Sequence, residues 1–138
     1  MMEKMKLSEI AQALGQKTDK EAEITAICTD TRDIIKGCVF VAIKGDRFDG
    51  HDFCIQAVEK GAEAVITERQ IEGITCIVTE STRRAYLKLA EYYRSKFSPI
   101  LVGVTGSVGK TTTKEMVSLV LSEKSEYFFS IPFSLERR

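Results

Sequence analysis

The chain has 138 residues, enough for one modest domain or for one domain and part of a second. Lysine and arginine together number 20, as do aspartate and glutamate, so no charge excess indicates nucleic-acid binding or an acidic tail. The apolar runs are too short to span a membrane, and charges interrupt the N-terminus where a secretion signal needs an apolar core. We therefore predict a cytoplasmic, monomeric protein with neither nucleic acid nor a membrane as its partner.

The cysteines do not have the spacing of a metal site. They are Cys28, Cys38, Cys54 and Cys76, and no two of them form a C-x-x-C pair. The single histidine, His51, is not near two of them in the sequence. A zinc site or a disulfide framework would need tighter or more patterned spacing. We therefore predict reduced cysteines that are mostly buried.

Helical and strand patterns alternate along the first half of the chain. Residues 6–15 have apolar residues at helical spacing, with Ser8 as a candidate N-cap and Gly15 as a candidate stop. Residues 24–32 are predicted as a short strand that runs into a polar turn. Residues 37–45 are rich in β-branched and aromatic side chains, which favours a strand buried on both faces of a parallel or mixed sheet.

The same alternation continues toward a Ser-Pro pair at positions 98 and 99. A short helix is predicted over 54–62, strands over 62–68 and 74–80, and the longest helix over 81–97. The predicted apolar stripe of the longest helix consists of Tyr86, Leu89, Ala90, Tyr93 and Phe97. Strands that alternate with helices predict an α/β fold, and the proline predicts a first domain over 1–98.

The stretch GVTGSVGKTTTKE, residues 103–115, has the pattern of a phosphate-binding loop. An apolar strand is predicted before it, over 100–104, and an amphipathic helix after it. Glycines let backbone N–H groups approach a triphosphate, and the N-terminus of a helix favours the anion. Lys110 can reach the outer phosphates, and the Thr111 hydroxyl is placed to coordinate Mg²⁺. The predicted ATP-binding residues are Gly106, Ser107, Val108, Gly109, Lys110, Thr111 and Thr112.

This loop resembles the ATP loop of the Mur ligases, which build the peptide of bacterial cell-wall precursors. Val104 departs from the general spacing G-x-x-x-x-G-K-S/T, for which an incidental glycine turn is the alternative, but the departure is the rule in that family. The first hundred residues resemble the family as well. The matching segments are T-D-T-R (29–32), G-C-V-F-V-A-I-K-G-D-R-F-D-G-H-D-F (37–53) and Q-A-V-E-K-G-A-E-A-V-I (56–66).

The resemblance implies a three-domain enzyme, of which two domains are represented. Residues 1–98 resemble the N-terminal domain, which holds the uridine diphosphate end of the substrate. Residues 99–138 resemble the start of a truncated central domain, which holds ATP. By matching positions, the implied UDP-substrate residues are Thr29, Thr31, Arg32, Asp46, Arg47 and Phe48. Lys110 and Thr111 are the implied catalytic residues, Lys110 on the phosphates and Thr111 on Mg²⁺.

The Lys114-Glu115 pair most resembles the branch of the family that adds D-alanyl-D-alanine to a UDP-N-acetylmuramoyl tripeptide. The implied reaction passes the γ-phosphate of ATP to the tripeptide carboxylate, and the amine of the dipeptide then attacks the acyl phosphate. Two alternatives stay open. One is a non-catalytic module that binds a UDP-sugar peptide or a protein partner. The other is a different ligase of the superfamily, including a folylpolyglutamate-type enzyme.

Two motifs of the first domain also have purely structural interpretations. The segment 30–32 could be a strand-end turn with an exposed ion pair. D-G-H-D-F, residues 49–53, could be a turn followed by a helix cap, with Asp52 near the helix start. We predict His51 to be a loop or capping residue that has no partner elsewhere in the chain.

The resemblance ends at Lys124, where the family would continue its central domain. A truncated gene, a frameshift near Ser125 or a shortened chain would each produce this ending. A lone strand and helix bury little apolar surface, so we expect residues 100–138 to be poorly ordered or packed on the first domain. We also expect no ligase turnover from the 138 residues alone.

Overall fold

The structure is a computed structural model, and it describes residues 3–98 and 103–122. The chain divides into two compact units, Met1–Ser98 and Pro99–Arg138, which are described separately. Within the described residues, no helix is long and apolar enough to cross a membrane.

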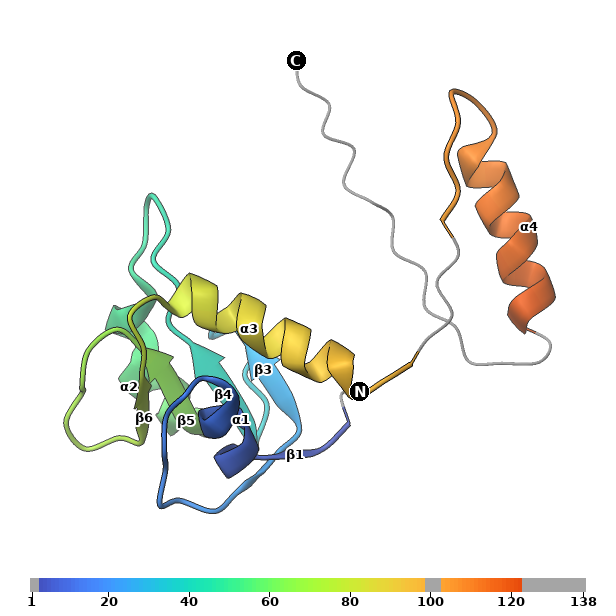
Figure 1. The fold of residues 1–138 in the computed structure, drawn as a ribbon. Coiled ribbons are helices and arrows are strands. Elements are labelled where there is room, and N and C mark those ends of the chain that lie inside the picture. The colour runs from blue at the N-terminus through green and yellow to red at the C-terminus, as the bar shows by residue number, and fades with distance from the viewer. Residues whose placement is uncertain (1–2, 99–102, 123–138) are drawn as a thin grey trace. The chain divides into compact units, whose positions relative to one another are not determined.

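The first unit is built on a four-stranded parallel sheet (Figure 1). Its strands are β3 (Ala26–Cys28), β4 (Cys38–Val41), β5 (Ala62–Thr67) and β6 (Cys76–Val78), in the order β3-β4-β5-β6. A separate antiparallel pair joins β1 (Met5–Lys6) to β2 (Glu23–Ile24). The predicted α/β fold class is therefore confirmed, with its parallel and antiparallel pairings in two different sheets.

Helices cover both faces of the parallel sheet (Figure 1). Helices α1 (Leu7–Ala13) and α3 (Thr82–Ser95) share one core with Val39 and Val41 of β4. Helix α2 (Cys54–Glu59) shares the other core with Phe40. Every residue of β4 is buried, because successive side chains of a strand point to opposite faces and both faces are covered.

The first helix begins earlier than predicted. Its N-cap is Lys6, whose backbone N–H donates to the Glu9 carboxylate at 2.8 Å. The prediction of Ser8 as the cap was therefore wrong, because Ser8 already lies inside the first turn and Glu9 satisfies the helix end. Gly15 follows the C-cap Leu14 with a φ of 73°, as a stop signal predicts.

The longest helix, α3, has Ser81 as its N-cap, and its buried face is rotated from the predicted stripe. Ala85 and Leu89 are buried, whereas Tyr86 is 39% exposed. The residues of the predicted stripe that do not reach the buried core are Tyr86, Ala90 and Phe97. Ala85 and Leu89 share a core cluster with Val39 and Val41 of β4, so this face of the helix is the one turned toward the sheet.

The cysteines are mostly buried, as predicted. Cys28, Cys38 and Cys54 are buried and Cys76 is partly buried, and all four are free thiols. Burial raises the pKa of the Cys38 and Cys54 thiols to about 11, so both remain protonated at neutral pH. Residues 3–98 and 103–122 contain no group of three acidic, histidine or cysteine side chains that could hold a metal ion.

The second unit contains helix α4 (Lys110–Ser122), preceded by residues 103–109 without regular structure. The helix predicted after the glycine loop is thus present, and it begins at Lys110 itself. The predicted strand over 100–104 lies mostly outside the described residues, and Gly103 and Val104 are not in a strand. About half of residues 100–138 lie outside the described ranges, and the prediction that this segment is poorly ordered or packed on the first domain stays a prediction.

Candidate functional site

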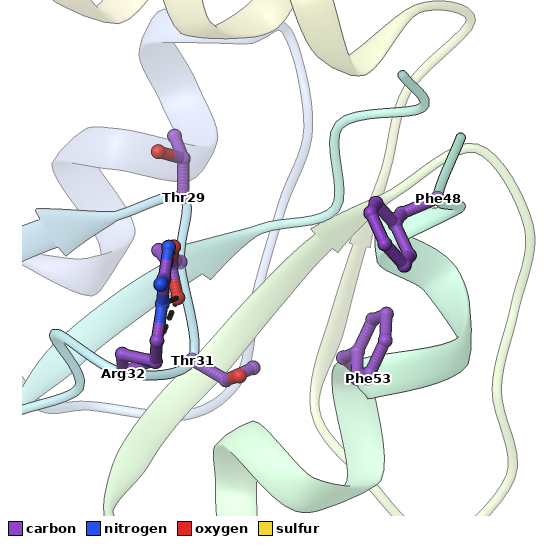
Figure 2. Close-up of a pocket in the computed structure, with 6 residues that line it drawn as sticks. Thr29, Thr31, Arg32, Phe48 and Phe53 are labelled. Atoms are coloured by element: carbon purple, nitrogen blue, oxygen red, sulfur yellow. Dashed lines mark hydrogen bonds and ion pairs between the residues drawn. The ribbon is translucent and has the colours of Figure 1, made fainter. Parts of the chain in front are cut away.

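A hollow of about 270 Å³ opens on the first unit (Figure 2). Its lining residues are Thr29, Asp30, Thr31, Arg32, Phe48 and Phe53. One wall is the turn after β3, and the other is formed by the segment that follows β4. Both segments follow the carboxyl ends of neighbouring parallel strands, which is where open α/β sheets bind ligands.

The first wall is a tight polar turn. The Asp30 carboxylate accepts from the Arg32 backbone N–H at 2.8 Å and from Nε at 3.0 Å, and it also accepts from a terminal guanidinium nitrogen. Hydrogen bonds from the Arg32 side chain and backbone lower the pKa of Asp30 to about 2. The Arg32 side chain is 86% exposed, so its outer face remains accessible to an anion. Arg32 is therefore both a partner in the predicted ion pair and a predicted site residue.

A lysine that sequence reasoning missed supports this turn from behind. The Lys60 ammonium donates to the Thr31 carbonyl at 2.9 Å. Lys60 is the C-cap of α2 and is distant from the turn in sequence, so no local pattern links the two. Its charge adds to that of Arg32 at the same wall.

The second wall presents two aromatic rings. Figure 2 shows Phe48 and Phe53 on the side of the hollow opposite the polar turn. Phe48 is 71% exposed and Phe53 is 37% exposed, which is unusual for phenylalanine and leaves ring faces open for stacking. Phe48 was predicted as a site residue, whereas Phe53 was missed because its position suggested only a helix start. Asp46 and Arg47 are exposed near the hollow in sequence but do not line it.

The loop that carries Phe48 is held at its base. Lys44 and Asp49 form an antiparallel bridge, and the Gly45 N–H donates to the Phe48 carbonyl at 2.9 Å. Gly50 lies so close to the end of β4 that an added Cβ would be 2.7 Å from the Ile43 backbone nitrogen and oxygen. Only glycine allows this close approach, which fixes the position of the loop relative to the end of β4.

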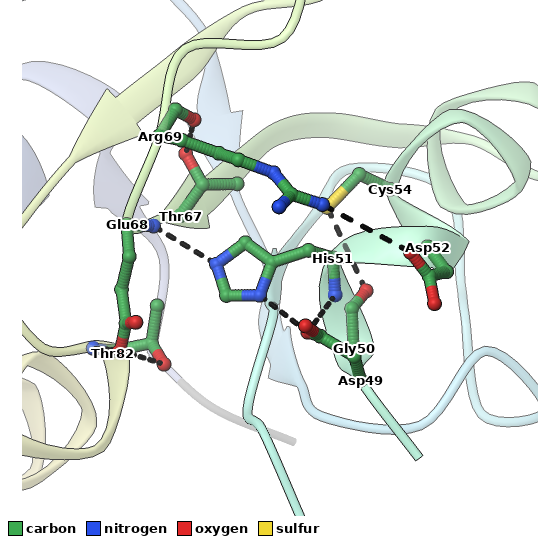
Figure 3. A network of polar contacts seen from close by, with 9 residues as sticks. All are labelled: Asp49, Gly50, His51, Asp52, Cys54, Thr67, Glu68, Arg69 and Thr82. Carbon is green, nitrogen blue, oxygen red and sulfur yellow. Dashed lines mark hydrogen bonds and ion pairs between the residues drawn. The ribbon is translucent and has the colours of Figure 1, made fainter.

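The prediction that His51 has no partner was wrong (Figure 3). His51 is 7% exposed, with Nδ1 2.6 Å from the Asp49 carboxylate and Nε2 3.0 Å from the Glu68 backbone nitrogen. The short helix η1 (Gly50–Phe53) places the imidazole beside the end of β5, and this juxtaposition across 17 residues leaves no trace in local sequence. Asp49 is the N-cap of η1, and Asp52 lies inside this helix. A cap is therefore present in this segment, but at the residue that was predicted as part of the turn.

The second unit presents the glycine loop as one continuous exposed stretch. Gly106 and Gly109 have φ values of 150° and 77°, which other residues rarely adopt. The Lys110 ammonium donates to the Gly106 carbonyl, and the Thr113 N–H donates to the Gly109 carbonyl at 2.9 Å as α4 begins. The seven predicted ATP-binding residues all lie in this loop or the first turn of α4, and all are exposed. Glycines before a helix N-terminus, with a lysine and a threonine hydroxyl, fit a triphosphate and its Mg²⁺.

Parallel strands that end in a hollow, together with a glycine loop that leads into a helix, are typical of nucleotide-binding α/β proteins. The comparisons with known proteins make this class specific. The model of the Mur ligase family, catalytic domain, matches residues 23–100. The chain therefore belongs to the Mur ligase family, as the resemblance of its motifs predicted.

Two of the curated relatives that are similar to this chain have the names of different ligases of the family. A UDP-N-acetylmuramoyl-tripeptide--D-alanyl-D-alanine ligase from Synechocystis is 45% identical over 108 residues, which cover 75% of this chain and 24% of that protein. A UDP-N-acetylmuramoyl-L-alanyl-D-glutamate--2,6-diaminopimelate ligase from Listeria monocytogenes is 38% identical over 128 residues, covering 88% and 26%. The chain thus spans about a quarter of the length of these relatives.

Two solved structures of MurF are similar in fold. MurF from Acinetobacter baumannii has a TM-score of 0.73 and 37% identity, over 89% of this chain and 28% of that one. MurF ligase from Thermotoga maritima, solved in complex with ADP, has a TM-score of 0.65 and 40% identity, over 78% and 26%.

Proposed function

We propose that this chain is part of an ATP-dependent ligase that joins D-alanyl-D-alanine to a UDP-N-acetylmuramoyl tripeptide in peptidoglycan precursor synthesis. The observation that carries the proposal is the hollow between a polar turn and two open phenylalanine rings, in a chain 45% identical to a ligase of that name. Residues 1–98 would hold the UDP end of the substrate, and the loop before α4 would hold ATP.

The chemistry of the hollow suits a uridine diphosphate. The exposed rings of Phe48 and Phe53 offer stacking surfaces for a pyrimidine, and the hydroxyls of Thr29 and Thr31 can hydrogen-bond its polar edge or the ribose. The outer face of the Arg32 guanidinium can meet a diphosphate oxygen. Asp46 and Arg47 would join the site only if the exposed loop that carries them moves toward the ligand.

The loop before α4 would supply the positioning of ATP. Lys110 would neutralise the outer phosphates and Thr111 would hold Mg²⁺, which when bound adds positive charge against the phosphates. In the proposed reaction the tripeptide carboxylate takes the γ-phosphate and becomes an acyl phosphate. The amine of the dipeptide then forms the amide bond as phosphate leaves. In this reaction the main roles of the protein are to position the reacting groups and to neutralise the charge of the phosphates.

One other function has a specific observation in its favour. Relatives that add diaminopimelate match as much of the chain as the D-alanyl-D-alanine ligases do. Both names specify a UDP-N-acetylmuramoyl substrate, and they differ in the length of its peptide. Because the hollow lies in the part of the chain that resembles the UDP-substrate domain, it predicts the shared UDP group more directly than it predicts the added residue.

Calorimetry of the whole 138-residue chain tests the proposal. We expect UDP-N-acetylmuramoyl tripeptide to bind, and the double variant F48A/F53A to lose about tenfold to a hundredfold in affinity, since stacking contributes about 1–3 kcal/mol per base. The matched control is Leu87→Ala, because Leu87 is 64% exposed on α3 and does not line the hollow. No binding by the unaltered chain would refute the UDP site. For the 138 residues by themselves we expect binding without ligase turnover.

A partner-binding module is the outcome if no nucleotide binds. If the chain alone released phosphate in a way that depends on D-alanyl-D-alanine, our expectation of no ligase turnover would be contradicted. Comparing tripeptide and dipeptide forms of the UDP ligand separates the two ligase types only if the chain contacts the peptide. Equal affinity for both forms would confine recognition to the UDP-sugar end.

A further inference from the structure

We propose that His51, as a neutral imidazole with its proton on Nδ1, is a positioning residue that holds Phe48 and Phe53 in place at the hollow. The inference rests on the proposed function of the hollow as a UDP site. It concerns a side chain that does not itself line the hollow and that would act through the two rings on either side of it in the sequence.

The hydrogen bonds of His51 require one tautomer. The Glu68 backbone N–H can only donate, so the Nε2 atom, 3.0 Å away, must be the acceptor and carry no proton. The proton of a neutral imidazole then lies on Nδ1, which donates to the Asp49 carboxylate at 2.6 Å. The imidazole is 4% exposed, so water has little access to either ring nitrogen.

These contacts connect the segment between Phe48 and Phe53 to the rest of the first unit, and Figure 3 shows them. On one side, the Asp49 carboxylate accepts from both the ring and the backbone N–H of His51. The Asp49 backbone forms the antiparallel bridge with Lys44 at the base of the Phe48 loop. On the other side, the Glu68 carboxylate accepts from the backbone N–H of Thr82 at 3.0 Å, where α3 begins. One imidazole therefore connects the loop after β4 to the end of β5 and, through Glu68, to α3.

His51 lies between Phe48 and Phe53 in the sequence, so its contacts affect the segment that carries both rings. Phe48 lies three residues before His51 and Phe53 two residues after it, and these side chains are 71% and 37% exposed. The exposed part of a ring gains no packing energy from the protein, so the hydrogen-bonded backbone between the two residues contributes more to fixing their place. Gly50 provides one anchor at Ile43, and His51 provides the second.

Two conservative substitutions separate the two halves of the connection. The amide nitrogen of asparagine lies near the place of Nδ1, so His51→Asn can keep the donor to Asp49 but cannot reach Glu68. The amide of glutamine lies near the place of Nε2, so His51→Gln can present an oxygen to the Glu68 N–H. We expect H51N to weaken binding of UDP-N-acetylmuramoyl tripeptide by about tenfold and H51Q by less than about threefold.

The readouts are chosen to distinguish positioning from general loss of structure. Circular dichroism checks that both variants are folded, and ¹⁵N NMR of the unaltered chain checks the tautomer. The ring signals of Phe48 and Phe53 report their environment without ligand, and we expect them to shift in H51N and to return toward the original in H51Q. The matched control is Asp52→Asn, because Asp52 is exposed beside His51 and contacts only Arg69 at 3.9 Å among the side chains of this network.

The inference and the proposed function can fail separately. If the unaltered chain binds no UDP ligand, the proposed function is refuted, while the ring signals still test the role of His51. Unchanged ring signals in H51N would overturn the inference, as would a proton found on Nε2. Ligand affinity of H51N within about twofold of the unaltered chain would overturn it as well. If H51N does not fold, rescue of both fold and affinity by H51Q supports the inference, and loss of affinity in folded H51Q overturns it.

Discussion

The two units of this chain differ in how much apolar side chain they bury. The first unit buries large side chains in two clusters on opposite faces of its sheet, and Leu89 of α3 is 1% exposed in one of them. In α4 of the second unit, Met116 and Val120 are 63% and 72% exposed. The hollow is therefore built on an enclosed core, whereas the glycine loop is built on a helix whose described side chains pack little within their unit. Stability should respond to substitutions in the first unit and hardly at all to those in α4.

Leu89→Ala is expected to have the largest effect, a loss of about 2–5 kcal/mol in the free energy of unfolding, because it leaves a cavity in the larger core. Met116→Ala in α4 should change it by less than about 0.5 kcal/mol. Urea denaturation measures both, with Leu87→Ala on the exposed side of α3 as the matched control. A Met116→Ala loss as large as that of Leu89→Ala would mean that α4 is buried in the folded chain.

Gly50→Ala tests the close approach that pins the loop of the hollow. An added Cβ would be 2.7 Å from backbone atoms of Ile43, which cannot move without displacing β4, so we expect a loss of about 3 kcal/mol. The control is Gly45→Ala in the same loop, where the nearest atom would be at an ordinary 3.6 Å. Similar denaturation midpoints for the two variants would show that the loop is not pinned there.

Lys110→Ala tests whether the two units bind their ligands separately. Removing the ammonium should weaken ATP binding by about 2 kcal/mol, or about thirtyfold, because a hydrogen bond to a charged group is lost. Affinity for the UDP ligand should not change, since Lys110 belongs to the other unit. Calorimetry with each ligand in turn gives the answer, and a parallel loss of UDP affinity would show that the sites are coupled.

Asp30→Asn should have the smallest effect, a slight loss of stability that is present at neutral pH and disappears in acid. Hydrogen bonds from Arg32 lower the pKa of Asp30 from an ordinary 3.8 to about 2, so the ionised form is favoured in the folded chain. The contribution is fully present above pH 3.8 and is lost as pH falls toward 2. Because the pair is exposed, the effect is small and salt should reduce it further. In acid titrations followed by NMR of the turn after β3, the unaltered chain should show a titration of Asp30 that Asp30→Asn lacks, and the stabilities of the two proteins should converge toward pH 2.

Much of the fold was predictable from local patterns, because each pattern reflects a local preference. The all-apolar β4 required cover on both faces, and the structure provides it with α1 and α3 on one side and α2 on the other. The two errors had different sources. The cap was wrong because of a local contact, in which Glu9 satisfies the helix end at Lys6 in place of Ser8. The buried face of α3 was wrong because packing in the core buries Ala85 and not Tyr86.

The candidate site was likewise predicted only in part. Family resemblance pointed to Thr29, Thr31, Arg32 and Phe48, and these four residues do meet in one hollow. The same reasoning missed Phe53 and Lys60, and it left His51 without the partners it has at Asp49 and Glu68. The contact of His51 with Asp49 is local and was overlooked. The contacts of Lys60 with Thr31 and of His51 with Glu68 have no signature in sequence, because each depends on which strand ends lie side by side.

The sequence by itself determined the glycine loop, the presence of a helix after it and the alternation of strands and helices in residues 1–98. These features depend on neighbouring residues, whose backbone preferences and spacing act over a few positions. Only the tertiary structure decided that a turn after β3 faces two rings after β4, and that one buried imidazole joins those rings to β5. The parallel sheet brings the carboxyl ends of separate strands to one edge, so residues distant along the chain become a single surface.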